Sequence, residues 1–141
     1  MARKIIQRIF VDRMDYGDLV LYLASSDKGA IKVGIRMAGD EDPLSFFARF
    51  FPQTALIRSA KHNTSLGSAI KLALEGRPLP NSICLDVDFT PFQHRAYQCI
   101  CSIPYGHTMT YGEVAKAMGL PGAARAVGQA MRVNPLPIIF P

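Results

Sequence analysis

The sequence predicts an α+β protein of two lobes: a sheet-containing N-terminal lobe and an all-α, helix-turn-helix C-terminal lobe. Three observations lead to this fold class. Short apolar runs typical of strands fill most of the first 36 residues, helix start signals dominate after residue 90, and a segment rich in proline and glycine lies between them at 76–81. We therefore predict lobes over residues 1–80 and 81–141.

Three strands are predicted to form an antiparallel sheet in the N-terminal lobe. They cover residues 5–11, 19–25 and 30–36, and residues 26–29 make a tight hairpin between the last two. In the third run, Ile31, Val33 and Ile35 alternate with residues 32, 34 and 36, as in a strand with one buried face.

Two helices are predicted next. Asp42 and Pro43 are typical of a helix cap and first helical residue, and the four phenylalanines at 46, 47, 50 and 51 are expected in the core. A second helix is predicted over residues 64–75, with Gly76 as its stop. Its apolar face consists of Leu66, Ala69, Ile70, Ala73 and Leu74.

The C-terminal lobe starts with a capped helix. Thr90, Pro91 and Gln93 make a capping box that predicts a helix to about residue 102. Its apolar face consists of Phe92, Ala96, Cys99, Ile100 and Ile103. Cys99 is therefore predicted to be a core thiol, whereas Cys101 lies off this face.

A second capping box predicts a helix-turn-helix. Thr110 and Glu113 begin a short helix that ends at residues 119–121, and a longer helix follows over 122–132. Many helical pairs have the same spacing, so the composition of the longer helix adds the stronger argument. Its predicted apolar face consists of Ala123, Ala126, Val127, Ala130 and Met131, and its outward face of Ala124, Arg125, Gly128, Gln129 and Arg132.

That outward face carries small residues and two cations but no carboxylate, which favours close approach to a phosphate backbone. An ordinary solvated face is the alternative. After it, residues 134–137 cannot be helical, and residues 138–140 are typical of a short buried strand. An apolar end of this kind predicts that the chain is truncated.

Composition limits the possible classes of protein. Hydrophobic residues make up 49% and charged residues 19%, which excludes a disordered tail. No apolar run is long enough for a membrane span, and three cysteines without metal or redox spacing favour a reducing compartment, so we expect a cytoplasmic protein. The net charge is +5, and residues 90–141 carry four basic side chains against one acidic side chain, which suits an anionic partner.

Five stretches resemble the methylated-DNA–protein-cysteine methyltransferases, repair proteins that take an alkyl group from O6 of guanine onto their own cysteine. They are FTPFQ at 89–93, IPYG at 103–106, TYGEVA at 110–115, ARAVG at 124–128 and NPLPIIFP at 134–141. The resemblance implies a winged-helix-like C-terminal lobe. It also implies a ribonuclease-H-like N-terminal lobe, which the predicted strands and helices suit without any motif.

The family signature continues Pro-Cys-His-Arg, and Pro141 matches its first residue. The resemblance thus implies an acceptor cysteine directly after Pro141, so this chain contains no catalytic residue and is expected to be inactive by itself. None of Cys84, Cys99 and Cys101 matches the acceptor. No metal or cofactor is expected, and His94 and His107 lack metal-ligand spacing.

By resemblance, Arg125 is the arginine that enters the base stack and Tyr111 is the tyrosine that helps rotate the base out. Ala124 and Gly128 would permit close backbone approach in the minor groove. The remaining residues have two interpretations each. Thr110 and Arg132 would contact phosphates, although Thr110 is also explained as a cap, and Asn134 would brace a turn, although asparagine before proline is common in turns.

The implied function is single-turnover repair of O6-alkylguanine in double-stranded DNA, with base flipping, by a monomer without a membrane partner. In a bacterium it would work at the nucleoid, and in a eukaryote in the nucleus. One alternative is a non-catalytic alkyltransferase-like protein that binds the lesion without transfer. Another is a generic helix-turn-helix regulator, which would not use residues 134–141.

Overall fold

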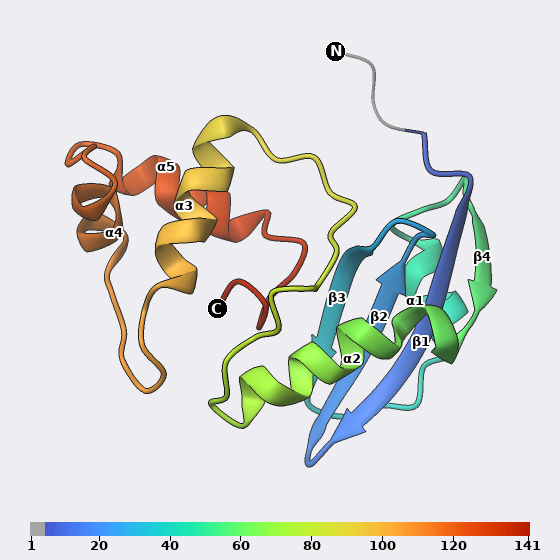
Figure 1. The fold of residues 1–141 in the computed structure, drawn as a ribbon. Coiled ribbons are helices and arrows are strands. Elements are labelled where there is room, and N and C mark those ends of the chain that lie inside the picture. Colours follow the sequence, from blue (N-terminus) through green and yellow to red (C-terminus); the bar gives the residue numbers. More distant parts are fainter. Residues whose placement is uncertain (1–4) are drawn as a thin grey trace. The chain divides into compact units, whose positions relative to one another are not determined.

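The computed structural model describes residues 5–141. The chain forms two compact units, Met1–Val87 and Asp88–Pro141 (Figure 1). The first unit contains a sheet with two helices, and the second is helical, so the α+β fold class is confirmed. The division falls inside the segment 81–141 that we assigned to the second lobe. Within the described residues, no helix is both long and apolar enough to cross a bilayer.

The sheet of the first unit contains four strands, of which the second and third have the predicted bounds, whereas the first covers residues 8–16 instead of 5–11 and the fourth was not predicted. The strands β1 (Arg8–Tyr16), β2 (Leu19–Ser25) and β3 (Ala30–Arg36) are antiparallel to one another, and β4 (Ala55–Arg58) pairs in parallel with β1. The strand order is β3-β2-β1-β4, which makes the sheet mixed rather than purely antiparallel. Only four residues form β4, too few to produce a recognisable alternation.

Helix α1 (Pro43–Ala48) begins as predicted, since the side chain of Asp42 accepts a hydrogen bond from the Leu44 backbone N–H at 2.8 Å. Of its phenylalanines, Phe46 and Phe47 are buried. Phe50 is 45% exposed, so its prediction as a core residue is wrong. The Lys32 ammonium lies 4.6 Å from the centre of the Phe50 ring and shields that ring at the surface.

The core beside α1 requires a glycine in β3. The ring of Phe46 stacks on Tyr22 and occupies the place where a side chain on Gly34 would lie. Ile31 and Val33 are buried as predicted, but Ile35 is 40% exposed. The predicted alternation fails there because Ile35 stands near the end of an edge strand.

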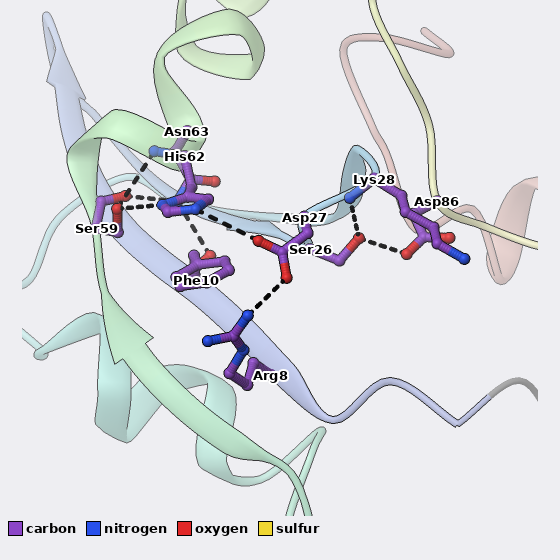
Figure 2. Close-up of polar contacts among 9 residues, drawn as sticks. All are labelled: Arg8, Phe10, Ser26, Asp27, Lys28, Ser59, His62, Asn63 and Asp86. Carbon is purple, nitrogen blue, oxygen red and sulfur yellow. Dashed lines mark hydrogen bonds and ion pairs between the residues drawn. The ribbon is translucent and has the colours of Figure 1, made fainter.

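Helix α2 (Ala60–Leu74) begins four residues earlier than predicted, because Ser59 rather than a later residue caps it. Leu66, Ala69 and Ile70 of its predicted face are buried. Figure 2 shows the polar contacts around its first turn. The buried Asn63 accepts a hydrogen bond from the Ser25 hydroxyl at 2.8 Å and donates to the Phe10 carbonyl at 3.0 Å, so α2, β1 and β2 are joined.

His62 lies against the same turn (Figure 2). Its ring stacks on Phe10, its Nδ1 lies 2.7 Å from the Ser59 hydroxyl, and its Nε2 lies 3.6 Å from the Asp27 carboxylate. The Ser59 hydroxyl also accepts a hydrogen bond from the His62 backbone N–H. The contact between Ser59 and His62 is therefore part of the N-terminal cap of α2. Nearby, the buried Asp86 accepts a hydrogen bond from Ser26.

The second unit consists of α3 (Pro91–Cys101), α4 (Tyr111–Ala117) and α5 (Ala124–Arg132). Both predicted capping boxes are present, whereas α5 begins two residues later than predicted. Residues 138–140 form a turn, not the predicted strand, since the Phe140 N–H bonds to the Leu136 carbonyl at 2.9 Å. All four strands among the described residues belong to the first unit, so the structure shows no wing strand beside these helices.

Candidate nucleic-acid interface

The start of α4 is fixed by its own capping box. The Thr110 hydroxyl accepts the Glu113 backbone N–H at 3.1 Å, and the Glu113 carboxylate accepts the Thr110 backbone N–H at 2.7 Å. Thr110 is therefore a cap, as one of its two interpretations proposed. Its phosphate contact stays a prediction, and the hydroxyl proton is still available to donate.

The end of α4 is closed by a tight turn and by an arginine from α3. Gly119 takes the left-handed conformation (φ +76°), and the Leu120 N–H bonds to the Ala115 carbonyl at 2.9 Å. The guanidinium of Arg95 donates to the Met118 carbonyl at 2.6 Å. The sequence pattern identified Arg95 only as a positive charge, because its partner lies on another helix.

The start of α5 has no side-chain cap, unlike that of every other described helix. The other caps are Asp42, Ser59, Thr90 and Thr110, whereas Ala123 cannot accept a hydrogen bond through its side chain. The first N–H groups of α5 have no partner within the helix, and the helix dipole makes this end positive. A shallow depression surrounds it, lined by Gly122, Ala123, Ala124, Arg125, Ala126 and Gln129.

The two faces of α5 largely follow the prediction. Val127 and Ala130 are buried, and Arg125, Gln129 and Arg132 are exposed. Ala126 was predicted on the apolar face but is exposed, because the helix turns it toward the depression next to Arg125. Ala124 and Gly128 are half-buried rather than fully outward.

The positive charges of the second unit lack acidic partners. In the first unit, Arg8, Arg13, Arg36, Arg49, Arg58 and Arg77 each pair with an aspartate or glutamate. In the part of the chain that the structure describes, no carboxylate forms an ion pair with Lys116, Arg125 or Arg132. The surface of α4 and α5 is therefore a basic region whose charges are not neutralised by ion pairs with described residues.

Tyr111 and Gly128 are brought together by the packing of α4 on α5. Tyr111 is the first residue of α4 and is 52% exposed. A Cβ atom on Gly128 would lie 3.2 and 3.3 Å from two carbons of the Tyr111 ring, Cδ2 and Cε2. The resemblance implied that both residues belong to the interface, but it did not reveal that they touch.

Asn134 holds the turn that follows α5. Its side-chain amide donates to the Phe140 carbonyl at 2.8 Å, and its oxygen accepts the Leu136 N–H at 3.0 Å. Within this turn Ile138 takes a left-handed conformation (φ +76°), which is rare for a β-branched residue. The Asn134 side chain therefore braces this turn, which agrees with both of its interpretations.

Two residues of α3 secure the same turn. The Tyr97 ring stacks on Phe140, with ring centres 4.9 Å apart, while its hydroxyl donates to the Ala130 carbonyl of α5 at 2.6 Å. The Cys101 thiol donates to the Ile139 carbonyl at 3.5 Å, and desolvation raises the pKa of this thiol. Cys101 is therefore protonated at neutral pH and weakly nucleophilic.

The other candidate ligands are dispersed. Cys99 is half-buried with its sulfur 3.9 Å from the Val114 carbonyl, Cys84 is exposed in the first unit, and His94 and His107 are exposed as predicted. No cluster of histidine, cysteine and carboxylate side chains able to hold a metal occurs within residues 5–141.

Comparison with known proteins identifies similar chains and structures. Residues 91–141 match the family "6-O-methylguanine DNA methyltransferase, DNA binding domain". The inducible methylated-DNA–protein-cysteine methyltransferase of Bacillus subtilis is 30% identical over 126 residues, which cover 89% of this chain and 70% of that protein. The corresponding protein of Mycobacterium leprae is 53% identical over 60 residues, which cover 43% of this chain and only 36% of that protein.

The crystal structure of Mycobacterium tuberculosis OGT in complex with DNA superposes with a TM-score of 0.69 at 28% identity, covering 94% of this chain and 75% of that chain. The M. tuberculosis O6-methylguanine methyltransferase gives a TM-score of 0.68 at 29% identity, with the same coverage. The likeness therefore includes both the sheet-containing unit and the helical unit.

Proposed function

This chain belongs to the methylated-DNA–protein-cysteine methyltransferase family, and from that premise we propose that its protein repairs O6-alkylguanine in double-stranded DNA by transferring the alkyl group to a cysteine. The observation that carries the proposal is the surface of α4 and α5. It combines unpaired cations, an uncapped helix start and an exposed tyrosine on one helix-turn-helix. Such a surface suits a phosphate backbone and a displaced base.

The DNA-binding residues act in two groups. Thr110, Arg132 and the open start of α5 contact phosphates in the minor groove and position the protein as a monomer. Arg125 enters the base stack, and Tyr111 contacts the rotated guanine. Base extrusion costs roughly a few kcal/mol, which an inserted side chain partly offsets.

The transfer step needs a thiolate, and none of Cys84, Cys99 and Cys101 matches the acceptor cysteine of the family signature. The thiolate attacks the alkyl carbon, an S–C bond forms, and the C–O bond breaks with its electron pair going to guanine O6. The reaction needs no dissociable cofactor and occurs once per protein molecule. The turn braced by Asn134 lies within residues 134–141, the stretch that resembles the family signature.

Replacement of Arg125 tests the DNA-binding part of the proposal. The R125A variant is expected to lose about tenfold in affinity for a duplex containing O6-methylguanine and much less for an intact duplex, since only the lesion complex uses base extrusion. Fluorescence anisotropy with both duplexes measures this. The matched control R132A, on the same helix, should weaken both duplexes alike. Equal weakening by R125A would reduce Arg125 to a phosphate contact.

A non-catalytic alkyltransferase-like protein is the second candidate, favoured by the absence of an acceptor among Cys84, Cys99 and Cys101. Intact-mass measurement of the complete gene product separates the two after stoichiometric incubation with the O6-methylguanine duplex. One added methyl group on one cysteine supports transfer. An unchanged mass together with retained lesion binding supports the non-catalytic protein.

A further inference from the structure

Gly128 occupies the middle of α5, where glycine is an unfavourable helix residue and needs a reason. Two reasons are available at an interface of this kind. The missing side chain could let DNA approach the helix backbone, or it could make room for part of the protein. In the first case DNA occupies the place of the absent Cβ, and in the second case another part of the protein does.

In this structure that place faces the Tyr111 ring. A Cβ on Gly128 would stand 3.2 Å from Cδ2 and 3.3 Å from Cε2, closer than ordinary van der Waals contact. Neighbouring glycines differ. A Cβ on Gly122 would meet nothing within 4 Å, and one on Gly112 would meet only the Thr110 hydroxyl at 3.8 Å. Among these three glycines, Gly128 is therefore the one beside which another side chain, the Tyr111 ring, fills the space that a Cβ would need.

The contact also links the two residues that the proposed function uses to displace a base. Gly128 follows Arg125 by three positions on α5, so the two lie on neighbouring turns of one helix face. Tyr111 stands at the capped start of α4 and keeps half of its surface exposed. A ring held against α5 has a fixed height and orientation relative to Arg125.

We propose that Gly128 is a positioning residue for Tyr111: its missing side chain seats the tyrosine ring on α5 and so sets the orientation in which the ring meets the displaced guanine. The proposal rests on the proposed function, because it assigns Tyr111 a role in lesion binding. It differs from direct approach of DNA to Gly128, since the protein itself fills the space beside the glycine.

The first test is G128A. The added methyl group displaces the ring, so affinity for the O6-methylguanine duplex should fall about fivefold while affinity for the intact duplex stays within twofold. Alanine favours a helix over glycine, so the midpoint of thermal unfolding should stay the same or rise. The control G112A adds the same methyl group where there is room, and it should leave lesion affinity unchanged.

A double-mutant cycle separates the two reasons for the glycine. In a Y111A background, G128A should have no further effect on lesion affinity, because no ring remains to be displaced. An undiminished fivefold loss in that background would show direct contact between Gly128 and DNA and would overturn the inference. Loss of affinity for both duplexes alike would overturn it as well.

A spectroscopic signal adds a readout that a purely structural role would not change. With 2-aminopurine next to the lesion, saturating protein should raise the fluorescence through unstacking, and G128A should lower that plateau. An unchanged plateau would overturn the inference. If the unsubstituted protein does not distinguish the two duplexes at all, the proposed function fails and the inference fails with it. If it does distinguish them and the cycle is additive, only the inference fails.

Discussion

The thiol of Cys101 is held by a backbone carbonyl, although part of the residue is exposed. Partial desolvation favours the protonated form and raises the pKa of the thiol, which donates to the Ile139 carbonyl. Because the folded protein holds this proton more tightly than the unfolded chain does, the resulting stability is complete at neutral pH. It declines as the pH rises through the folded-state pKa.

The raised pKa of Cys101 should make this cysteine react more slowly with iodoacetamide than Cys84 does. At neutral pH the exposed Cys84 should react first and Cys101 severalfold more slowly, because the thiolate is the reacting species. Raising the pH should accelerate Cys101 until the two rates approach each other. Peptide mapping by mass spectrometry at several pH values measures both rates. Equal rates at neutral pH would contradict the raised pKa of Cys101.

At the scale of elements, α3 joins α5 to the turn that follows it. Tyr97 contacts both, through its hydroxyl on the Ala130 carbonyl and its ring on Phe140. Desolvation raises the pKa of Tyr97, so its hydroxyl stays protonated and donates. The orientation of α5 is thus coupled to the turn that Asn134 braces.

The Y97F variant removes the hydroxyl and keeps the ring. It should lower the free energy of unfolding by about 1 kcal/mol, because the Ala130 carbonyl loses its buried donor. It should also weaken binding of the lesion duplex.

The control Y22F loses an equivalent hydroxyl, which donates to the Glu41 carbonyl at 2.8 Å in the first unit. It should cost similar stability and leave DNA affinity unchanged; equal effects of both variants on DNA affinity would exclude this coupling. Urea unfolding and anisotropy give the two quantities.

Elements defined by local signals could be predicted, and those defined by distant contacts could not. The capping boxes at Thr90 and Thr110 depend on residues three positions apart, and both helices begin as predicted. Strand β4 exists because β1 is available for pairing, and residues 138–140 turn because Asn134 bonds across them. These partners are far apart in the sequence or depend on a turn geometry that apolar periodicity does not encode.

The same distinction applies to the candidate site. The exposure of Arg125 and Arg132 follows from helical spacing. The contacts of Arg95 with Met118 and of Tyr111 with Gly128 join different helices, so no spacing along one helix could reveal them. Ser59 was missed as a cap because the first turn of α2 contains no large apolar residue that would mark the true start of the helix.

For the whole molecule, the distribution of basic side chains without an ion-pair partner decides where DNA is attracted. The arginines of the first unit that form ion pairs are neutralised by nearby carboxylates, whereas Arg125 and Arg132 have no such partner among residues 5–141. Long-range attraction of DNA should therefore come chiefly from the surface of α4 and α5.

The salt dependence of DNA binding should show this asymmetry. In a plot of log K against log salt concentration, R132A should reduce the slope by about 1, because one phosphate contact and its released counterion are lost. The control R77A in the first unit, where Arg77 lies 3.6 Å from Glu75, should leave the slope unchanged. Titrations at several salt concentrations with an intact duplex measure both slopes. Similar changes in both variants would indicate a second DNA-binding surface.

The left-handed Ile138 has a consequence for attempts to make this protein more heat-resistant. A β-branched residue in that conformation costs about 1–3 kcal/mol. Asn134 bonds to Leu136 before Ile138 and to Phe140 after it, and Cys101 bonds to Ile139, so the turn is held on both sides. Random mutagenesis with heat selection would therefore favour glycine or asparagine at position 138. Such variants would stay folded at higher temperatures, but their turn would be less rigid. Ile138 therefore lowers the thermal stability of the fold while it keeps the turn in one conformation.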